Sequence, residues 1–327
     1  MNRKIQIGVL GCASIAKRFI IPAILDLKEL YVLRGIASRS EETSKACAQQ
    51  FHTEAFTGYE ALLNSDNLDA VYIPLPNALH ADWVEKALQR NIHVLVEKSL
   101  ACSYDEVQRL NRMAEEKQLA LVENFQFRFH RQLAIIRAFV SEGMIGELRC
   151  LRSSFGFPPF SDSDNIRYNK RLGGGALLDA GAYPIKIAQM FLGNDTEMKA
   201  SSLYIDPEHD VDIWGGAYLQ QRSGSLYAEL AFGFDNYYQC NLELWGSKGK
   251  ITASRIFTAP PGFSPEITVE TGDGKEVIDI EPDHHFMNML MHFQRLITTG
   301  KDLKEEYEQN VQQARLIEAV KKTVHAG

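Results

Sequence analysis

Three side chains that can hold or transfer a proton stand out by their positions in the sequence. Lys98 follows the apolar segment 92–96, and the carboxyl end of such a strand opens on the ligand crevice of a parallel sheet. Asp179 and Tyr183 are four residues apart, which places a carboxylate and a phenol on one face of a helix. A strand-end lysine in solvent and a tyrosine packed in the core are the alternatives.

A turn near the start of the chain has the residue types of a phosphate site. Gly11-Cys12-Ala13-Ser14-Ile15-Ala16 stands between the apolar segment 5–10 and a helical stretch over about 14–27. Glycine permits a tight turn, small side chains let the backbone approach a phosphate, and N–H groups at a helix start attract its charge. The pattern indicates a dinucleotide pyrophosphate site. Because it is GxAxxA rather than GxGxxG, a generic strand-to-helix turn is the alternative.

The end of the next predicted strand, 31–38, favours one dinucleotide over the other. A site for NAD usually has an acidic residue there, which binds the ribose 2′-hydroxyl. This chain has Ser38-Arg39-Ser40 instead. A guanidinium flanked by hydroxyls suits a 2′-phosphate, so the sequence predicts NADP(H); an arginine exposed to solvent is the alternative.

The pattern of strands and helices that must position these residues changes after Glu123. Apolar segments alternate with helical ones up to that point, which indicates right-handed βαβ units and a parallel sheet. The apolar segments are 5–10, 31–38, 68–73, 92–96 and 120–122, and the helical ones are 14–27, 41–51, 78–89 and 104–116. We therefore expect a Rossmann dinucleotide-binding domain over residues 1–123.

The rest of the chain, 124–327, has the pattern of an α+β domain. Apolar residues alternate with polar ones over 149–155, 226–234 and 238–245, a hairpin turn is expected at 246–249, and helices at 175–191, 284–298 and 304–323. Such strands form an open, mainly antiparallel sheet with one covered face. The polar segment 158–170 is predicted to be a long functional loop. The glycine run 173–175 does not follow a strand, so we interpret it as a flexible helix entry.

Composition narrows the classes of function and location. The formal net charge of -7 argues against a nucleic-acid or membrane-surface binder, and no apolar stretch is long enough to span a bilayer. Five scattered cysteines without a CxxC pair suit a reducing compartment, so we expect a cytoplasmic protein. Metal binding is not expected, because the adjacent His284 and His285 point about 100° apart on a helix.

Five segments in a fixed order resemble one known family. They are the turn 11–16, IPLPNALH at 73–80, VEK at 96–98, ENFQFRFH at 123–130 and LGGGALLDAGAY at 172–183. Together they resemble the glucose–fructose oxidoreductase, inositol dehydrogenase and rhizopine catabolism (Gfo/Idh/MocA) family. Within it the chain looks most similar to NADPH-dependent sugar-nucleotide 3-ketoreductases. It departs from the family pattern at Ser99 and Arg131, where relatives usually or often have proline.

The resemblance implies roles for particular residues. Lys98 and Tyr183 are the expected catalytic pair, and a nearby ammonium would lower the ordinary tyrosine pKa of about 10. The expected cofactor-binding residues are Gly11, Cys12, Ala13, Ser14, Ile15, Ala16, Ser38, Arg39, Tyr59, Pro74, Leu75, Asn77, His80, Glu97, Arg167 and Asp179. The expected substrate-binding residues are Lys98, Asn124, Arg128, His130, Asp179, Tyr183 and Tyr237. For several of these, an ordinary polar surface position is the alternative.

Three functions are compatible with this pattern. The main hypothesis is an NADPH-dependent reductase of a keto-sugar, possibly nucleotide-linked. The second is a dehydrogenase of a free sugar, an inositol or a cyclic diol, and the third is a non-catalytic NADP-binding sensor. Relatives bury the open sheet face against a second subunit, so we expect a homodimer or homotetramer.

Overall fold

The computed structural model describes residues 3–162 and 165–324, and the chain divides into two compact units. The first comprises the chain up to Asn124 together with Phe286–Val311, and the second comprises Phe125–His285 together with the chain from Gln312 onward. The observed grouping differs from a single division after residue 123 at two places, at Asn124 and over Phe286–Val311. The helical segment from Phe286 to Val311 returns to the first unit, which a reading in sequence order does not reveal.

The first unit is built on a six-stranded parallel sheet with the order β3-β2-β1-β4-β5-β6. This is the Rossmann-type arrangement expected from the sequence. The strands are β1 (Ile5–Leu10), β2 (Tyr31–Ser38), β3 (Ala55–Thr57), β4 (Ala70–Ile73), β5 (His93–Glu97) and β6 (Leu121–Asn124). The helices are α1 (Ile21–Asp26), α2 (Glu41–Gln50), α3 (Tyr59–Leu63), α4 (Asn77–Gln89) and α5 (Tyr104–Glu116).

Local chemistry accounts for where these helices begin. Ser103 and Glu106 form a capping box at the start of α5, and the Ser40 side chain caps α2 by accepting from Thr43 N.

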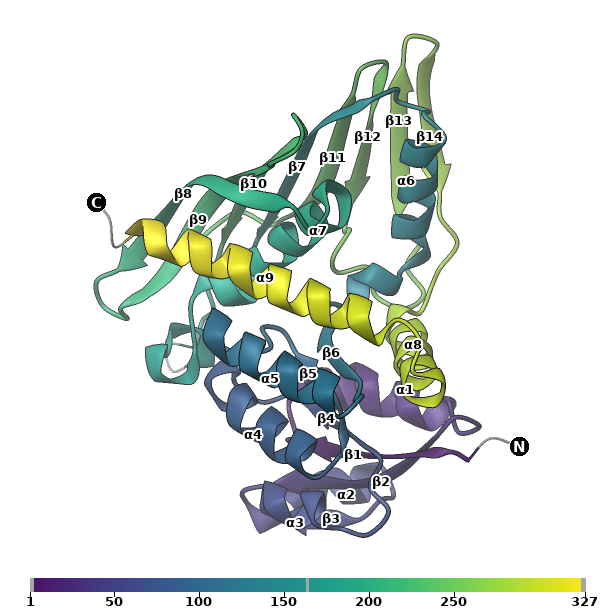
Figure 1. The fold of residues 1–327 in the computed structure, drawn as a ribbon, viewed down its shortest axis with the longest axis vertical. Helices are drawn as coiled ribbons and strands as arrows, with labels where there is room; N and C mark the ends of the chain where they lie inside the picture. Colours follow the sequence, from purple (N-terminus) through teal and green to yellow (C-terminus); the bar gives the residue numbers. More distant parts are fainter. Residues whose placement is uncertain (1–2, 163–164, 325–327) are drawn as a thin grey trace. The chain divides into compact units, whose positions relative to one another are not determined.

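The helix expected over 14–27 is divided: residues Ala16–Ile20 form a π-helical turn before α1. Pro22 stands at the start of α1, where its missing N–H leaves no bond to the preceding turn. Figure 1 shows α4 and α5 side by side.

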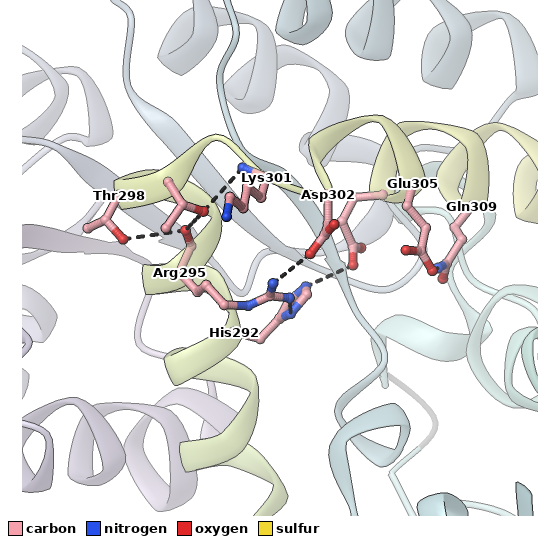
Figure 2. A network of polar contacts seen from close by, with 9 residues as sticks. His292, Arg295, Thr298, Lys301, Asp302, Glu305 and Gln309 are labelled. Atoms are coloured by element: carbon pink, nitrogen blue, oxygen red, sulfur yellow. Dashed lines mark hydrogen bonds and ion pairs between the residues drawn. The ribbon is translucent and has the colours of Figure 1, made fainter.

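Two helices from the end of the chain complete the first unit. They are α8 (His285–Thr299) and the first part of α9 (Leu303–Val324), joined by a short turn. Figure 2 shows the polar side chains that hold this turn: Arg295 Nη1 lies 2.5 Å from Asp302 Oδ2, and His292 Nε2 lies 2.9 Å from Glu306 Oε1. Asn310 Nδ2 donates to Leu121 O at 3.0 Å, which fixes α9 beside β6.

The second unit contains an eight-stranded sheet with the order β14-β13-β12-β11-β7-β10-β9-β8. All neighbours are antiparallel except β7 and β10, as expected for an open, mainly antiparallel sheet. The strands are β7 (Leu148–Gly156), β8 (Thr196–Asp206), β9 (Val211–Gln221), β10 (Tyr227–Gly233), β11 (Gln239–Gly246), β12 (Gly249–Ser254), β13 (Glu266–Thr271) and β14 (Gly274–Asp279). The predicted hairpin turn joins β11 to β12 and is confirmed.

Within the described part of the chain, helices cover one face of this sheet. Figure 1 shows α7 (Ala182–Leu192) against β7, β9 and β10. A further helix, α6 (Arg131–Ser141), precedes β7 and was missed by the sequence prediction, as were β8, β9 and β12–β14. Strand β13 alternates the buried Ile267 and Val269 with polar residues, so a period-two signal was present there and was overlooked. On the other face, Trp214 and Tyr204 stack at 3.9 Å between ring centroids, with 40% and 42% of each residue exposed.

Two negative findings concern the described residues alone. No helix in residues 3–162 and 165–324 has the length and apolar character needed to cross a bilayer. Within the same ranges, no three His, Cys, Asp or Glu side chains are grouped as ligands for a metal ion.

Candidate active site

The candidate residues of the first unit gather where its parallel strands end. The turn 11–16 follows β1, Ser38 ends β2, Pro74 follows β4 and Lys98 follows β5. Gly11 has φ 127°, a conformation that favours glycine, and a Cβ there would lie 3.0 Å from Leu75 Cδ2. The backbone therefore makes a close, side-chain-free turn at this edge, as a bound phosphate requires.

Arg39 and Tyr59 lie together at the end of β2. Burial raises the pKa of the Tyr59 phenol, and the Arg39 guanidinium beside it opposes this shift. Arg39 also precedes α2, whose first N–H groups attract negative charge. A cation, a phenol and a helix start therefore meet at the position where a dinucleotide fold places the adenosine ribose.

Cys12, in the same turn, lies near this group but is a poor nucleophile. Burial and the neighbouring Cys47 raise the pKa of its thiol to about 12. The thiol therefore stays protonated at neutral pH.

Two carboxylates, the half-buried Glu97 and the buried Glu123, support the segment that carries Lys98. Glu97 Oε1 accepts from Tyr72 Oη and from Asn124 Nδ2, both at 2.6 Å, and burial raises the pKa of Glu97. Glu123 Oε1 accepts from the N–H of Leu100 at 2.9 Å. The peptide bond between Lys98 and Ser99 is cis. These bonds fix the backbone on both sides of Lys98, and they engage Glu97 with protein groups, although the sequence suggested a cofactor contact for it.

His80 also differs from its expected place against the cofactor. Its ring is fully buried, with Nδ1 at 2.7 Å from Ser99 O and Nε2 at 2.7 Å from Leu75 O. Burial lowers the pKa of His80 to about 4, so the ring is neutral at physiological pH. Its position between the two carbonyls ties the segment after β4 to the segment that follows Lys98.

In the second unit, the glycine run before the signature helix is tightly packed rather than flexible. A Cβ on Gly174 would collide with the carbonyl of Arg167, and one on Gly175 would collide with Asp212. Gly175 N donates to Arg167 O at 2.9 Å, and Gly175 has φ 115°. The glycines are needed because two other segments approach the backbone here, which corrects the interpretation of this run as a flexible entry.

Asp212, on β9, caps the helix that these glycines open. Its Oδ2 accepts from Leu177 N at 2.5 Å, at the start of the π-helical turn Leu177–Gly181 that leads into α7. Burial raises the pKa of Asp212, and bonds from the N–H groups of Leu177 and Ala176 oppose that shift. The helix has no capping side chain of its own at Ala176, so a strand 35 residues further along supplies the acceptor.

Asp179 and Tyr183 follow on this helix in different surroundings. The Arg167 guanidinium lies 2.5 Å from Asp179 Oδ2 and stacks on the Phe160 ring, so Arg167 orients a carboxylate in its own unit. Tyr183 is 9% exposed and contacts four aromatic rings. Its centroid distances to Phe125, Phe127, Phe155 and Phe257 are 5.7, 5.9, 5.1 and 5.4 Å.

The remaining predicted substrate residues are dispersed in the second unit. Arg128 lies over the ring of Phe129, and His130 is buried against His285 at 5.7 Å between ring centroids. Tyr237 is 90% exposed in the turn between β10 and β11. The loop 158–170 folds into short 3₁₀ turns around Arg167; its residues 163 and 164 lie outside the described chain.

Comparison with known proteins agrees with this geometry. Residues 5–125 match the model of an oxidoreductase family with an NAD-binding Rossmann fold, and residues 133–252 match the Gfo/Idh/MocA C-terminal domain. This chain belongs to the Gfo/Idh/MocA oxidoreductase family. It is 39% identical over 317 residues to the dTDP-3,4-didehydro-2,6-dideoxy-α-D-glucose 3-reductase of Actinomadura kijaniata, which covers 97% of this chain and 95% of that protein.

A second relative and a solved structure extend the comparison. The D-xylose 1-dehydrogenase (NADP⁺) 2 of Haloferax volcanii is 33% identical over 98% of this chain and 97% of its own length. The crystal structure of KijD10, a 3-ketoreductase from A. kijaniata in complex with NADP and TDP-benzene, has a TM-score of 0.93 with 38% identity. That match covers 98% of both chains.

Sequence reasoning missed the residues that support the site from a distance. Asp212 lies on a strand that the hydrophobic pattern did not predict, and Glu123 was quoted only as the first letter of a motif. Lys186, one turn after Tyr183, is fully buried and was not considered. A charged residue within an apolar helical stretch was the available signal for Lys186, whereas no sequence signal pairs Asp212 with Leu177.

The cap on the signature helix leads to a stability prediction. We expect Asp212→Ala to lower the free energy of unfolding by about 1–3 kcal/mol, because it leaves a buried N–H without an acceptor. Asp212→Asn keeps one acceptor oxygen and should lose less. Urea denaturation followed by circular dichroism measures both. The control is Asp210→Asn, which removes the charge from an exposed ion pair with Lys170 in the same hairpin. Asparagine tolerates the φ of 53° at this position, so the variant should change stability little. Equal losses at the two positions would contradict the cap.

Proposed function

We propose that this protein reduces a keto-sugar with NADPH, the keto group being at C3 of a nucleotide-linked deoxysugar. The observation that carries the proposal is the similarity over nearly the whole chain to 3-reductases of this substrate class, combined with an intact set of Lys98, Asp179 and Tyr183. The presence of all three acid–base groups argues against a non-catalytic sensor. The relative from H. volcanii supports a second candidate, oxidation of a free sugar with NADP⁺.

The residues of the first unit fit NADPH. The turn at Gly11 admits a pyrophosphate close to the backbone, and Arg39 with Tyr59 offers a cation and a hydroxyl for the 2′-phosphate. NADPH supplies the hydride for the carbonyl carbon when it is bound. Residues 1–123 are assigned to cofactor binding, and residues 124–327 to substrate binding and subunit contact.

The carbonyl oxygen must gain a proton as the carbon gains the hydride. Lys98 and Tyr183 are the two candidates to deliver it. Lys98 has a backbone fixed by Glu123 and His80, and Tyr183 is held by aromatic rings, so each side chain is preorganised within its own unit. Asp179, held by Arg167, is assigned to bind sugar hydroxyls beside Tyr183.

We also propose that the protein is a cytoplasmic homodimer or homotetramer. All five cysteines are free thiols, which suits a reducing compartment. The uncovered sheet face has stacked aromatic pairs, Tyr204 with Trp214 and Tyr218 with Tyr227, and Arg152, which is bonded to Glu229 and Glu243. Aromatic residues and arginine are enriched in subunit interfaces.

The reaction is tested by the oxidation of NADPH against a panel of keto-sugars, free and nucleotide-linked. We expect turnover of a nucleotide-linked 3-keto-deoxysugar and a loss of at least about 100-fold in kcat for Lys98→Ala, because a positioned acid contributes about 10²–10⁴-fold.

Tyr183→Phe separates the two proton donors, since full activity in this variant would leave Lys98 as the donor. Turnover of free sugars with NADP⁺ alone would favour the dehydrogenase instead.

The cofactor assignment predicts a selective loss in Arg39→Ala. Removal of a charge-assisted bond to the 2′-phosphate should weaken NADPH binding by about 10-fold or more, while NADH, which has no such phosphate, changes little. Fluorescence titration measures both dissociation constants. Arg34→Ala is the matched control, because Arg34 lies on the same strand and pairs with Glu54. Equal weakening of NADPH and NADH would refute the 2′-phosphate contact.

The subunit interface predicts that a charge on the open sheet face separates the subunits. Trp214→Glu should convert the dimer or tetramer to a smaller species, because it places a carboxylate in an apolar contact. Size-exclusion chromatography with light scattering measures the mass. Leu25→Glu, at an exposed apolar position of the first unit, is the control. A wild-type protein that is monomeric at micromolar concentration would contradict the interface.

A further inference from the structure

Trp83, on α4, packs against Tyr59, the tyrosine whose phenol lies beside Arg39. The two rings meet edge to face, with 5.0 Å between their centroids and an interplanar angle of 81°. Tyr59 is buried at the start of α3, and Trp83 is half-buried. Aromatic pairs favour this arrangement and gain stability from it beyond the area that they bury. The Trp83 ring therefore restricts the positions that the Tyr59 ring can take.

Lys86 completes a ring of contacts between α3 and α4. Its Nζ lies 4.3 Å from the centroid of the Trp83 ring, within the range in which an aromatic face attracts an ammonium group. The same Nζ donates to Glu60 Oε1 at 2.7 Å. Glu60 is the residue after Tyr59 in α3, so one lysine contacts both the indole and the helix that carries the phenol. This arrangement fixes the Trp83 ring against the start of α3.

The backbone brings Tyr59 to the end of β2, where Arg39 stands. Ser38, the last residue of β2, pairs with Thr57 of β3, and Gly58 N donates to Ser38 O at 2.8 Å. Gly58 has φ 85°, a conformation that favours glycine, and it leads the chain from β3 into α3. Arg39 and Tyr59 therefore follow closely on two paired strand ends. The Arg39 guanidinium donates a hydrogen bond to the Tyr59 hydroxyl.

A phenol held in this way can help to bind a phosphate. Burial raises the pKa of Tyr59, so the hydroxyl keeps its proton at neutral pH. A hydroxyl both accepts and donates, so the oxygen can accept from Arg39 while its O–H donates to a ligand oxygen. Hydrogen bonds to a charged phosphate oxygen are roughly twice as strong as those to a neutral group. The two side chains therefore suit a ribose 2′-phosphate better than a ribose 2′-hydroxyl.

We propose that Trp83, held by Lys86, is a positioning residue for Tyr59 and thereby sets the preference of this site for a 2′-phosphorylated dinucleotide. The inference rests on the proposed function in one respect, the assignment of Arg39 and Tyr59 to the 2′-phosphate. A side chain that is already in place loses little freedom when the ligand binds. Loss of the indole should therefore weaken the phosphorylated ligand more than the ligand that lacks this phosphate.

The test is calorimetric titration of the full-length protein with NADPH and with NADH. The ratio of the two dissociation constants measures the preference for the 2′-phosphate. We expect Trp83→Leu to lower this ratio by about 3- to 10-fold, because the aromatic contact is lost. Trp83→Phe keeps a ring at this position and should retain most of the preference. Lys86→Met, which removes the cation above the indole, should lower the ratio by a smaller factor.

Arg90→Met is the matched control for the contact between the two helices. Arg90 follows α4 and donates to Asn64 Oδ1 at 2.9 Å, so it also joins α4 to α3, at the opposite end of α3 from Tyr59. This variant should leave the ratio unchanged. An equal fall of the ratio in Arg90→Met and Trp83→Leu would assign the effect to the packing of the helices and overturn the inference.

Tyr59→Phe determines whether Trp83 acts through the phenol. This variant removes the hydroxyl and should lower the ratio by itself. The addition of Trp83→Leu to it should cause little further fall, because the group that the indole positions is then absent. Falls that add in full would overturn the inference, as would an unchanged ratio in Trp83→Leu. Trp83→Met takes the place of the leucine variant if that variant does not fold.

The outcomes separate this inference from the proposed function. A selective loss of NADPH binding in Arg39→Ala, with an unchanged ratio in Trp83→Leu, would overturn the inference and leave the cofactor assignment in place. No sugar takes part in the titrations. A lowered ratio in Trp83→Leu without turnover of any keto-sugar would therefore support the inference and contradict the proposed reaction.

Discussion

The backbone at Gly174 and Gly175 has no room for a side chain, because two other segments approach it closely. The candidate site residues of the second unit depend on this approach. The carbonyl of Arg167 lies against one glycine and the carboxylate of Asp212 against the other. The same contact places the Arg167 guanidinium on Asp179 and the Asp212 oxygen on the N–H of Leu177. One packing constraint therefore has two consequences. It orients the Asp179 carboxylate, and it fixes the start of the helix that carries Tyr183.

Buried and half-buried ionisable groups recur in both units beside the candidate site residues, where they hold the surrounding segments in place. Glu97, Glu123 and His80 bond to strand ends and loops around Lys98, and Asp212 bonds to the helix that precedes Tyr183. Burial opposes the charged forms of Glu97, His80 and Asp212, so each is retained at some cost in stability. In return, these bonds preorganise the neighbouring side chains. A reacting group that is already held in place needs little rearrangement during the reaction.

The family membership and the chemistry are supported by different kinds of observation. The fold and the whole-chain similarity place the protein among NAD(P)-dependent oxidoreductases. Neither distinguishes reduction of a keto-sugar from oxidation of a sugar, since relatives of both kinds cover nearly the whole chain. The distinction depends on the groups that bind the ribose phosphate and the sugar, and Arg39, Lys98 and Tyr183 are the residues that we propose for these contacts.

The sequence by itself determined the strand-and-helix alternation of the first 123 residues, the glycine turn after β1 and the four-residue spacing of Asp179 and Tyr183. These features are local, because the hydrophobic period, the turn residues and the spacing each depend on residues that are close together in the sequence. The return of α8 and the start of α9 to the first unit, the cap from Asp212 and the placement of Lys186 beside Phe125 were decided only by the tertiary structure. Each joins segments far apart in the chain or depends on which face of a helix is buried, and a single sequence has no local signal for either.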